Sequence, residues 1–232
     1  MALPINGTAE GAWEAIRELK ARSARRPKET ASDLNHIFRA GSPPEGLDDR
    51  YQGMLVMTTQ GPLDGLARRL TSMWMPWLGK RFDRQAGAGD NLMVPAATAA
   101  ARFVWPRYRF RPAGEGVLSA FDFRTYLAPG LSDPDRVVLK IDYDLDLNPR
   151  FLIRSILDEL VMVGPQTYLG KVHMRRAGSW KLVGYFALRP SRPAVSQPDE
   201  LRIWESGDVA EEPQPAPRRR QSRRSRTETG PA

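Results

Sequence analysis

Apolar and polar residues alternate along much of the segment from residue 135 to residue 190. Between Val137 and Tyr143, apolar side chains occupy every second position, and further runs of strand-like sequence follow at 156–163, 166–175 and 179–189. Such alternation is typical of half-buried β-strands, and the Gly-Pro and Ala-Gly pairs between runs are typical of hairpin turns. The pattern predicts an antiparallel meander, which closes readily into a small barrel that holds side chains or one small ligand.

The sequence before this segment predicts short helices. Apolar residues recur at helical spacing over 9–23, with Thr8 as the N-cap. The charged, Pro-containing stretch 24–30 predicts a linker, and a second short helix is expected over 31–40, ended by Gly41.

The middle of the chain mixes helical and strand-like patterns. Pro62 at a first helical position precedes an apolar stripe that reaches Trp74, which predicts a helix. A Gly/Ala-rich stretch after residue 83 predicts a flexible segment. The remaining expected elements are a strand at 50–58, a short strand or loop at 74–83, a weak helix at 96–104, and strands at 107–111 and 118–128.

These patterns predict a mainly β protein with α additions, divided into three parts. Residues 1–45 form an N-terminal helical segment, and residues 46–190 form an antiparallel β-barrel domain. Residues 191–232 lose periodicity and are rich in Pro, Arg, Ser and Glu. Because such a segment buries too little apolar surface to offset its chain entropy, we expect a disordered tail.

Composition narrows the classes of function. The chain of 232 residues contains no cysteine, which excludes a disulfide framework and thiolate metal sites. It lacks a secretory h-region and any apolar run long enough to span a membrane, so a cytoplasmic location is expected. The net charge of +8 invites a nucleic-acid interpretation. Outside the tail, however, the basic residues are scattered, which mainly serves solubility.

Two short motifs resemble a known family. Residues 77–82 read Trp-Leu-Gly-Lys-Arg-Phe, and a strand start at 49–53 reads Asp-Arg-Tyr-Gln-Gly. With the order of elements over residues 45–190, they resemble uncharacterised bacterial proteins that pair a GXWXG domain with a calycin-like, lipocalin-related barrel. Asp49 stands where the family has its first Gly, and Tyr51 stands where it has Trp. The resemblance implies a calycin-like barrel and an apolar ligand, and supplies no catalytic residues.

The leading functional hypothesis is non-enzymatic binding of a small apolar, lipid-like molecule in the barrel. Gly170 and Gly184 share strand faces with large apolar side chains, and a missing side chain leaves room in a barrel interior. The residues expected to line or cover the cavity are Tyr51, Trp74, Trp77, Tyr168, Trp180 and Phe186.

A second hypothesis is a small enzyme that uses the same cavity. His173 would act as a general base, oriented by Asp158 or Glu159 on the preceding strand. It requires His173 to face inward, whereas the alternation assigns Val172 and Met174 to the interior. No metal or cofactor is expected, because the two histidines are far apart and the Asp142–Asp146 run lacks the Gly and Glu of a calcium loop.

A third hypothesis is an interaction module that acts through its tail. An arginine cluster there would give weak, salt-sensitive contacts with nucleic acid or an acidic partner. Acidic residues between Asp199 and Glu212 would compete for it. The cluster consists of Arg218, Arg219, Arg220, Arg223, Arg224 and Arg226.

Overall fold

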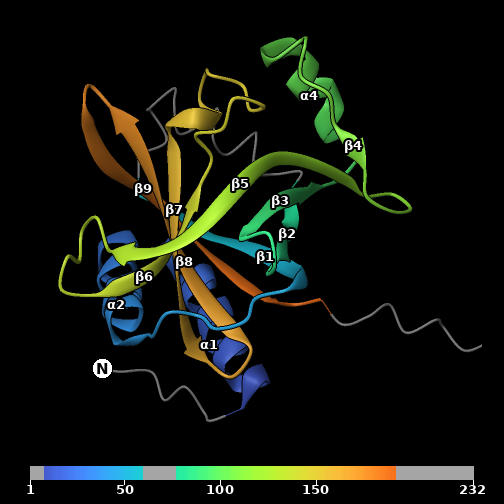
Figure 1. The fold of residues 1–232 in the computed structure, drawn as a ribbon. Helices are drawn as coiled ribbons and strands as arrows, with labels where there is room; N and C mark the ends of the chain where they lie inside the picture. The colour runs from blue at the N-terminus through green and yellow to red at the C-terminus, as the bar shows by residue number, and fades with distance from the viewer. Residues whose placement is uncertain (1–7, 60–76, 192–232) are drawn as a thin grey trace, which may run out of the picture. The chain divides into compact units, whose positions relative to one another are not determined.

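The protein folds into a closed antiparallel β-barrel with short helices before it, as the computed structural model shows for residues 8–59 and 77–191 (Figure 1). Eight strands form the ring in the order β3, β2, β1, β9, β8, β7, β6, β5, and β5 pairs back with β3 to close it. The predicted mainly β class and the C-terminal meander are confirmed. The helix expected after Pro62 and the tail expected from residue 191 lie, apart from Ser191, outside the described residues.

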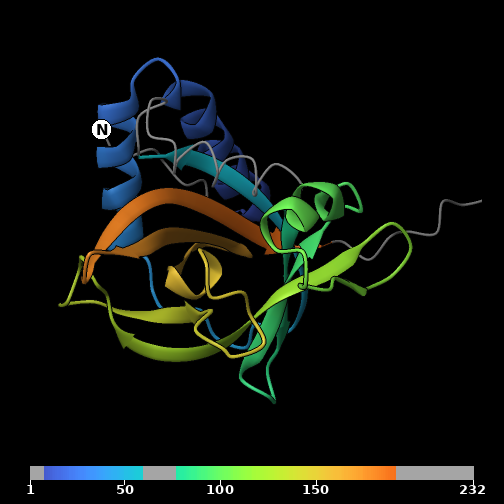
Figure 2. The ribbon, with the colours of Figure 1, turned by 90° about the horizontal axis from the view of Figure 1, so that it is seen from above.

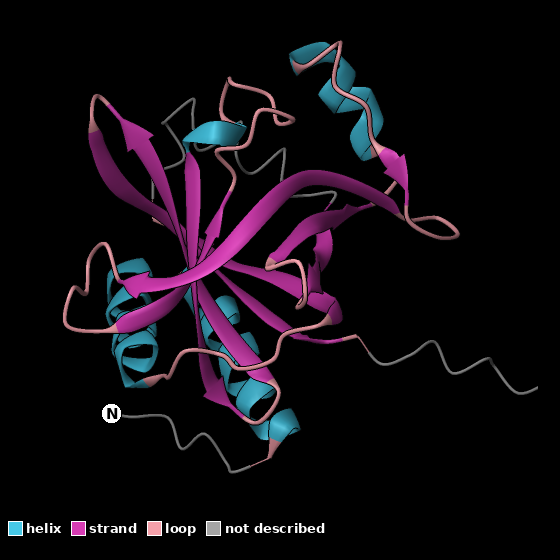
Figure 3. Cartoon of the chain, in the orientation of Figure 1, coloured by secondary structure: helices cyan, strands magenta, loops and turns pink. Residues whose placement is uncertain are grey.

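Figure 3 distinguishes the helices (cyan) from the strands (magenta). Their bounds are α1 (Ala9–Ser23), α2 (Pro27–Ala40), β1 (Asp49–Thr58), β2 (Trp77–Asp83), β3 (Ala88–Met93), α4 (Ala97–Val104), β4 (Arg111–Pro112), β5 (Leu118–Pro129), β6 (Val137–Asp142), the 3-10 turn η1 (Ile153–Ser155), β7 (Ile156–Gly164), β8 (Thr167–Arg176) and β9 (Ser179–Pro190).

Helices α1 and α2 pack on the outer surface of the barrel (Figure 2). Thr8 caps α1 as predicted, accepting a hydrogen bond from the Gly11 amide at 3.1 Å. The apolar side of α1, which includes Trp13, and Phe38 of α2 join outward-facing strand residues such as Tyr185 in one buried cluster. No helix in the described part of the chain is long and apolar enough to cross a membrane.

Three local expectations were wrong. The stretch 24–30 is not all linker, because α2 already begins at Pro27, and proline fits the first helical turn well. The Gly/Ala stretch after residue 83 contains β3, which lacks an alternating pattern but is held by hydrogen bonds to both β2 and β5. In 107–111, only Arg111 belongs to a strand. Tyr108 and Phe110 instead pack their rings against Phe121.

The barrel interior is largely filled by side chains. Aromatic rings run through it in a continuous series of edge contacts, with centroid separations of 5.4 Å to 5.6 Å. The series is Tyr168, Tyr51, Phe82, Phe123 and Tyr143. Stacked and edge-to-face aromatic pairs add stability beyond the area that they bury, so this core fixes the shape of the interior.

Gly170 contributes to this filling rather than to empty space. A Cβ at Gly170 would lie 2.2 Å from the ring of Phe186, which occupies the place that a side chain would take. The expectation that Gly170 leaves room in the cavity was therefore wrong at this position. The missing side chain accommodates an aromatic neighbour on the adjacent strand.

We predict that Gly170→Ala destabilises the protein by about 1–3 kcal/mol, because the new methyl group collides with the Phe186 ring. Urea unfolding measures the loss. Phe186→Leu in the same chain removes the collision, so the double variant is expected to lose less than the sum of the single variants. Strict additivity of the two losses would contradict the proposed contact.

Candidate functional site: a cavity with a buried ion pair

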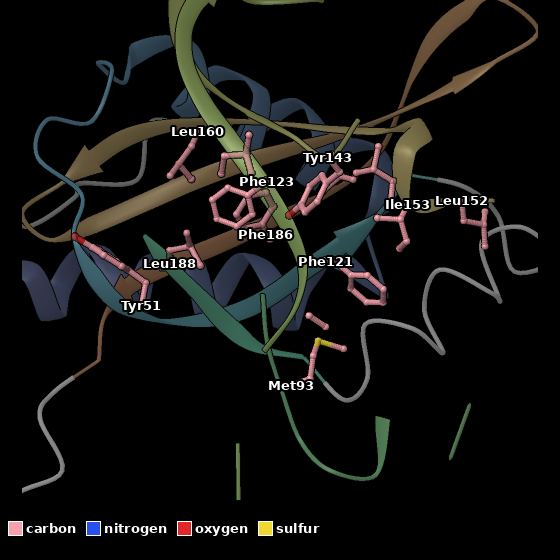
Figure 4. Close-up of a cluster of buried hydrophobic side chains, with 14 of the residues drawn as sticks. Tyr51, Met93, Phe121, Phe123, Tyr143, Leu152, Ile153, Leu160, Phe186 and Leu188 are labelled. Carbon is pink, nitrogen blue, oxygen red and sulfur yellow. The ribbon is translucent and has the colours of Figure 1, made fainter. Parts of the chain in front are cut away.

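A small cavity lies inside the barrel toward the end where η1 lies. The space open to the centres of water-sized molecules measures about 40 Å³. Figure 4 shows Met93, Phe121 and Ile153, which line it, on one side of Tyr143, and Tyr51, Leu160 and Leu188 on the other. The described lining residues are Leu55, Trp77, Lys80, Asn91, Met93, Phe121, Tyr143, Ile153, Ile156, Asp158, Val172 and Phe186.

A lysine is buried in the wall of this cavity. Lys80 lies on β2, and its ammonium group is 3.0 Å from the carboxylate Oδ2 of Asp158 on β7. It also donates hydrogen bonds to Asn91 Oδ1, at 3.0 Å, and to the Tyr143 hydroxyl. Three acceptors therefore meet the three donor positions of the ammonium group.

Aromatic rings complete the surroundings of the lysine. The Lys80 nitrogen lies 5.0 Å to 5.5 Å from the ring centroids of Trp77, Phe123, Tyr143 and Phe186. The negative faces of such rings attract a cation, which offsets part of the cost of burying the charge. The cluster formed by Lys80, Asn91, Tyr143 and Asp158 is called the polar cluster below.

Burial shifts the protonation of the polar cluster. It lowers the pKa of Lys80, against the opposing effect of Asp158, and raises the pKa of Asp158, against the effects of Lys80 and Tyr143. Burial also raises the pKa of the Tyr143 hydroxyl well above its usual value. The neutral forms of Lys80 and Asp158 thus come closer in free energy to the ion pair than they would at a surface.

Hydrogen bonds within the polar cluster leave one acceptor, a carboxylate oxygen of Asp158, without a partner. Trp77 and Lys80 both donate to Asn91 Oδ1, which fixes the amide orientation, and the Asn91 amide nitrogen donates to the Phe121 carbonyl. Tyr143 donates to Asp158 Oδ2 at 3.1 Å. Asp158 Oδ1 is buried and has no hydrogen-bond partner in the described structure.

The structure separates Asp158 from His173 and Glu159, the other two residues of the enzyme hypothesis. Asp158 lines the cavity, whereas Glu159, its neighbour on β7, faces the outside of the barrel because side chains alternate along a strand. His173 lies on that outer side with Glu159, 3.9 Å from its carboxylate, and hydrogen-bonds Ser132. Val172 lines the cavity as expected. A cavity base formed by His173 is therefore not present.

The outer side of β7 and β8 carries a second buried polar cluster. Lys171 donates to Asp133 at 2.5 Å and to Asn35 at 2.6 Å, and Arg39 of α2 also binds Asp133. Lys140 pairs with Glu159. These contacts attach α2 and the loop between β5 and β6 to the barrel wall, which indicates a structural role for this cluster.

Only some of the residues predicted to line the cavity are among its described lining residues. Trp77 and Phe186 line it, with their rings in edge contact at 5.8 Å. Tyr51 and Tyr168 contact each other in the core and are not among the described lining residues. Trp74 lies outside the described residues.

Trp180 does not line the cavity. The register between β8 and β9 shifts so that Val172 pairs with Gly184 but His173 pairs with Leu182, which leaves Val183 as an extra residue. Such a bulge reverses which face the preceding residues occupy. Trp180 consequently pairs with Arg175, whose guanidinium lies 5.6 Å from the indole.

Sequence reasoning missed the polar cluster, although a signal existed. Lys80 shares its strand face with Phe82, and Asp158 shares its face with Ile156 and Leu160. A charged residue of each sign on an apolar strand face is the pattern expected of a buried ion pair. No group of residues suited to holding a metal ion occurs in the described ranges.

Comparisons with known proteins assign no family to this chain. No family model matches the chain, and no curated protein matches it. Among solved structures, the chain is similar to a protein from Thermomonospora curvata, with 16% sequence identity, coverage of 75% of this chain and 99% of that one, and a TM-score of 0.44.

We predict that Lys80→Met and Asp158→Leu each destabilise the protein by about 3–5 kcal/mol, because each leaves a buried group of opposite charge without its partner. The double variant should lose much less than the sum. Urea unfolding gives the values, and Arg17→Met, which breaks an exposed pair with Glu14, should cost at most about 1 kcal/mol. A loss for Lys80→Met as small as this control would contradict the role of the ion pair.

A second prediction concerns pH. Burial lowers the pKa of His173 from 6.5 to about 4, so between these values the unfolded chain binds a proton that the folded one does not. His173 therefore supports stability above pH 6.5, and this support falls by up to about 3 kcal/mol as the pH drops toward 4. His173→Gln should flatten the pH dependence of the free energy of unfolding, and His36→Gln, at an exposed histidine, should not. An equal pH dependence of the free energy of unfolding in the wild type and both variants would refute this role of His173.

Proposed function

We propose that this protein binds a small, mainly apolar molecule with one polar group in the cavity at the η1 end of its barrel. The observation that carries the proposal is a polar cluster set in an otherwise apolar cavity wall. Ligand sites in proteins combine apolar walls with a few convergent polar groups of this kind. A closed antiparallel barrel is a frequent container for such ligands.

The size of the cavity limits the ligand. A volume of about 40 Å³ holds a few water molecules and is far below that of a lipid chain. A ligand is therefore either a compact molecule or the end of a longer one whose remainder stays at the barrel mouth. The calycin-like resemblance agrees with an apolar ligand, and the filled opposite end of the barrel argues against a long one.

The polar cluster limits the chemistry of the ligand. All donors of Lys80 and Tyr143 are used within the cluster, and the unpaired group is the acceptor Asp158 Oδ1. A buried acceptor without a partner is costly, so a ligand hydroxyl that donates to it is favoured. A carboxylate ligand offers no donor and would face the charge of Asp158, which disfavours fatty acids.

Ethanol and acetonitrile, which are similar in size and small enough for a cavity that holds a few water molecules, test this function. We expect ethanol to bind saturably and on the order of tenfold more tightly than acetonitrile, which lacks a donor for Asp158. Ligand titrations followed by protein NMR give both dissociation constants. Acetate, whose carboxylate offers no donor, should also bind more weakly than ethanol.

A matched pair of variants locates the binding. Leu55→Trp places a bulky ring in the cavity wall and should abolish binding of the alcohol, whereas Leu127→Trp, on the exposed end of β5, should not. Absence of saturable binding by all three compounds would end the proposal. Binding that survives Leu55→Trp would show that the site lies elsewhere.

A further inference from the structure

Two segments beside the cavity expose apolar side chains next to arginines. The first, residues 102–109, contains the end of α4, and the second, residues 147–151, precedes η1. Phe103 is 94% exposed, Leu147 75% and Phe151 55%. These two segments are called the rim below.

The rim is a continuous structure at the cavity. Trp105 of the first segment is buried, and its indole nitrogen donates a hydrogen bond of 3.0 Å to the carbonyl of Phe151 in the second segment. Its ring contacts Phe121, which lines the cavity, and Ile153, two residues after Phe151, lines it too. The exposed side chains therefore project from two segments whose buried residues pack on the barrel.

The charge of the rim is positive. Its arginines are exposed, and no ion pair joins any of them to an acid of the described chain; they are Arg102, Arg107, Arg109 and Arg150. The nearby acids Asp144 and Asp146 are both paired with Arg154. The rim thus combines unpaired cations with apolar groups that water solvates poorly.

We propose that the rim docks on an anionic membrane surface. Apolar side chains that enter the boundary between headgroups and acyl chains gain burial, and arginines beside them bind lipid phosphates and are attracted by anionic lipid. Phe103, Leu147 and Phe151 are placed to enter this boundary.

The side chains of the rim favour a membrane over nucleic acid. Single-strand binding needs exposed rings on which bases stack. The rim exposes the rings of Phe103 and Phe151, but they lie on two separate segments, and the rings between the arginines, Tyr108 and Phe110, are packed against Phe121. Leu147 and Val104, which are exposed, have no ring to offer a base. A bilayer accepts aliphatic and aromatic groups alike.

Docking would also place the cavity at the bilayer. Apolar molecules dissolved in the membrane would then reach the cavity without crossing water. This last step alone rests on the proposed function, and vesicle binding can be measured whether or not a ligand binds.

Sedimentation of the full chain with vesicles tests the proposal. Vesicles of phosphatidylcholine with one part in three of phosphatidylserine should bind the protein, and vesicles of phosphatidylcholine alone should bind it far less. The double variant Arg102→Gln with Arg107→Gln should weaken binding on the order of fivefold for each arginine removed, and higher salt should weaken it further. Phe103→Ser with Phe151→Ser should also reduce it.

The controls keep the result specific to the rim. Leu127→Ser removes an apolar residue that is 59% exposed on the β5–β6 hairpin and should leave vesicle binding unchanged. The arginines of the C-terminal segment are present in every protein compared, so a difference belongs to the rim. Equal binding of both vesicle types, unchanged binding by the rim variants, or an equal loss in Leu127→Ser would overturn the proposal. Tighter binding of a labelled single-stranded oligonucleotide, lost in the arginine variant, would assign the rim to nucleic acid instead.

Discussion

The pairing of β3 with β5 closes the sheet, and closure determines what the interior can contain. Each of the eight ring strands has at least two partner strands, and among the described strands only the two-residue β4, which pairs with β5 alone, has one. Inward side chains from all eight strands then compete for one narrow space. Here large aromatic residues take most of it, and the remaining volume lies beside the polar cluster.

The Lys80–Asp158 pair is a costly feature of this interior. A buried ion pair rarely stabilises a fold more than apolar residues of the same volume would. Its surroundings reduce the cost, because three acceptors and four aromatic rings surround the ammonium group. A specific chemical purpose at the cavity accounts for such a pair better than stability does, and this reasoning leads to the proposed ligand site.

The pattern of the sequence was sufficient to predict the barrel and the inward face of some of its strands. Alternation in β7 and β8 correctly assigned Val172 and Met174 to the interior, because pleating allows no other arrangement once one face is buried. It failed where the backbone departs from regular pleating. The bulge at Val183 turned Trp180 away from the cavity, and β3 owes its conformation to its neighbours rather than to its own residues.

The candidate site was only partly predictable for a related reason. Phe186 was identified as a large apolar residue on an inward face and Trp77 as a residue that lines or covers the cavity, but empty volume depends on how rings from distant strands pack together. Gly170 shows this, since Phe186 fills the space that its missing side chain leaves. Lys80 and Asp158 are 78 positions apart in the sequence, and alternation within one strand contains no information on such a distant partner.

The cavity beside the polar cluster is proposed as a ligand site. A crystal structure of the protein soaked with ethanol tests it most directly. We expect density for the alcohol between Phe121, Val172 and Phe186, with its hydroxyl within hydrogen-bond distance of the Asp158 carboxylate. A cavity that holds only water, or that stays closed while the alcohol occupies another site, would contradict the proposal.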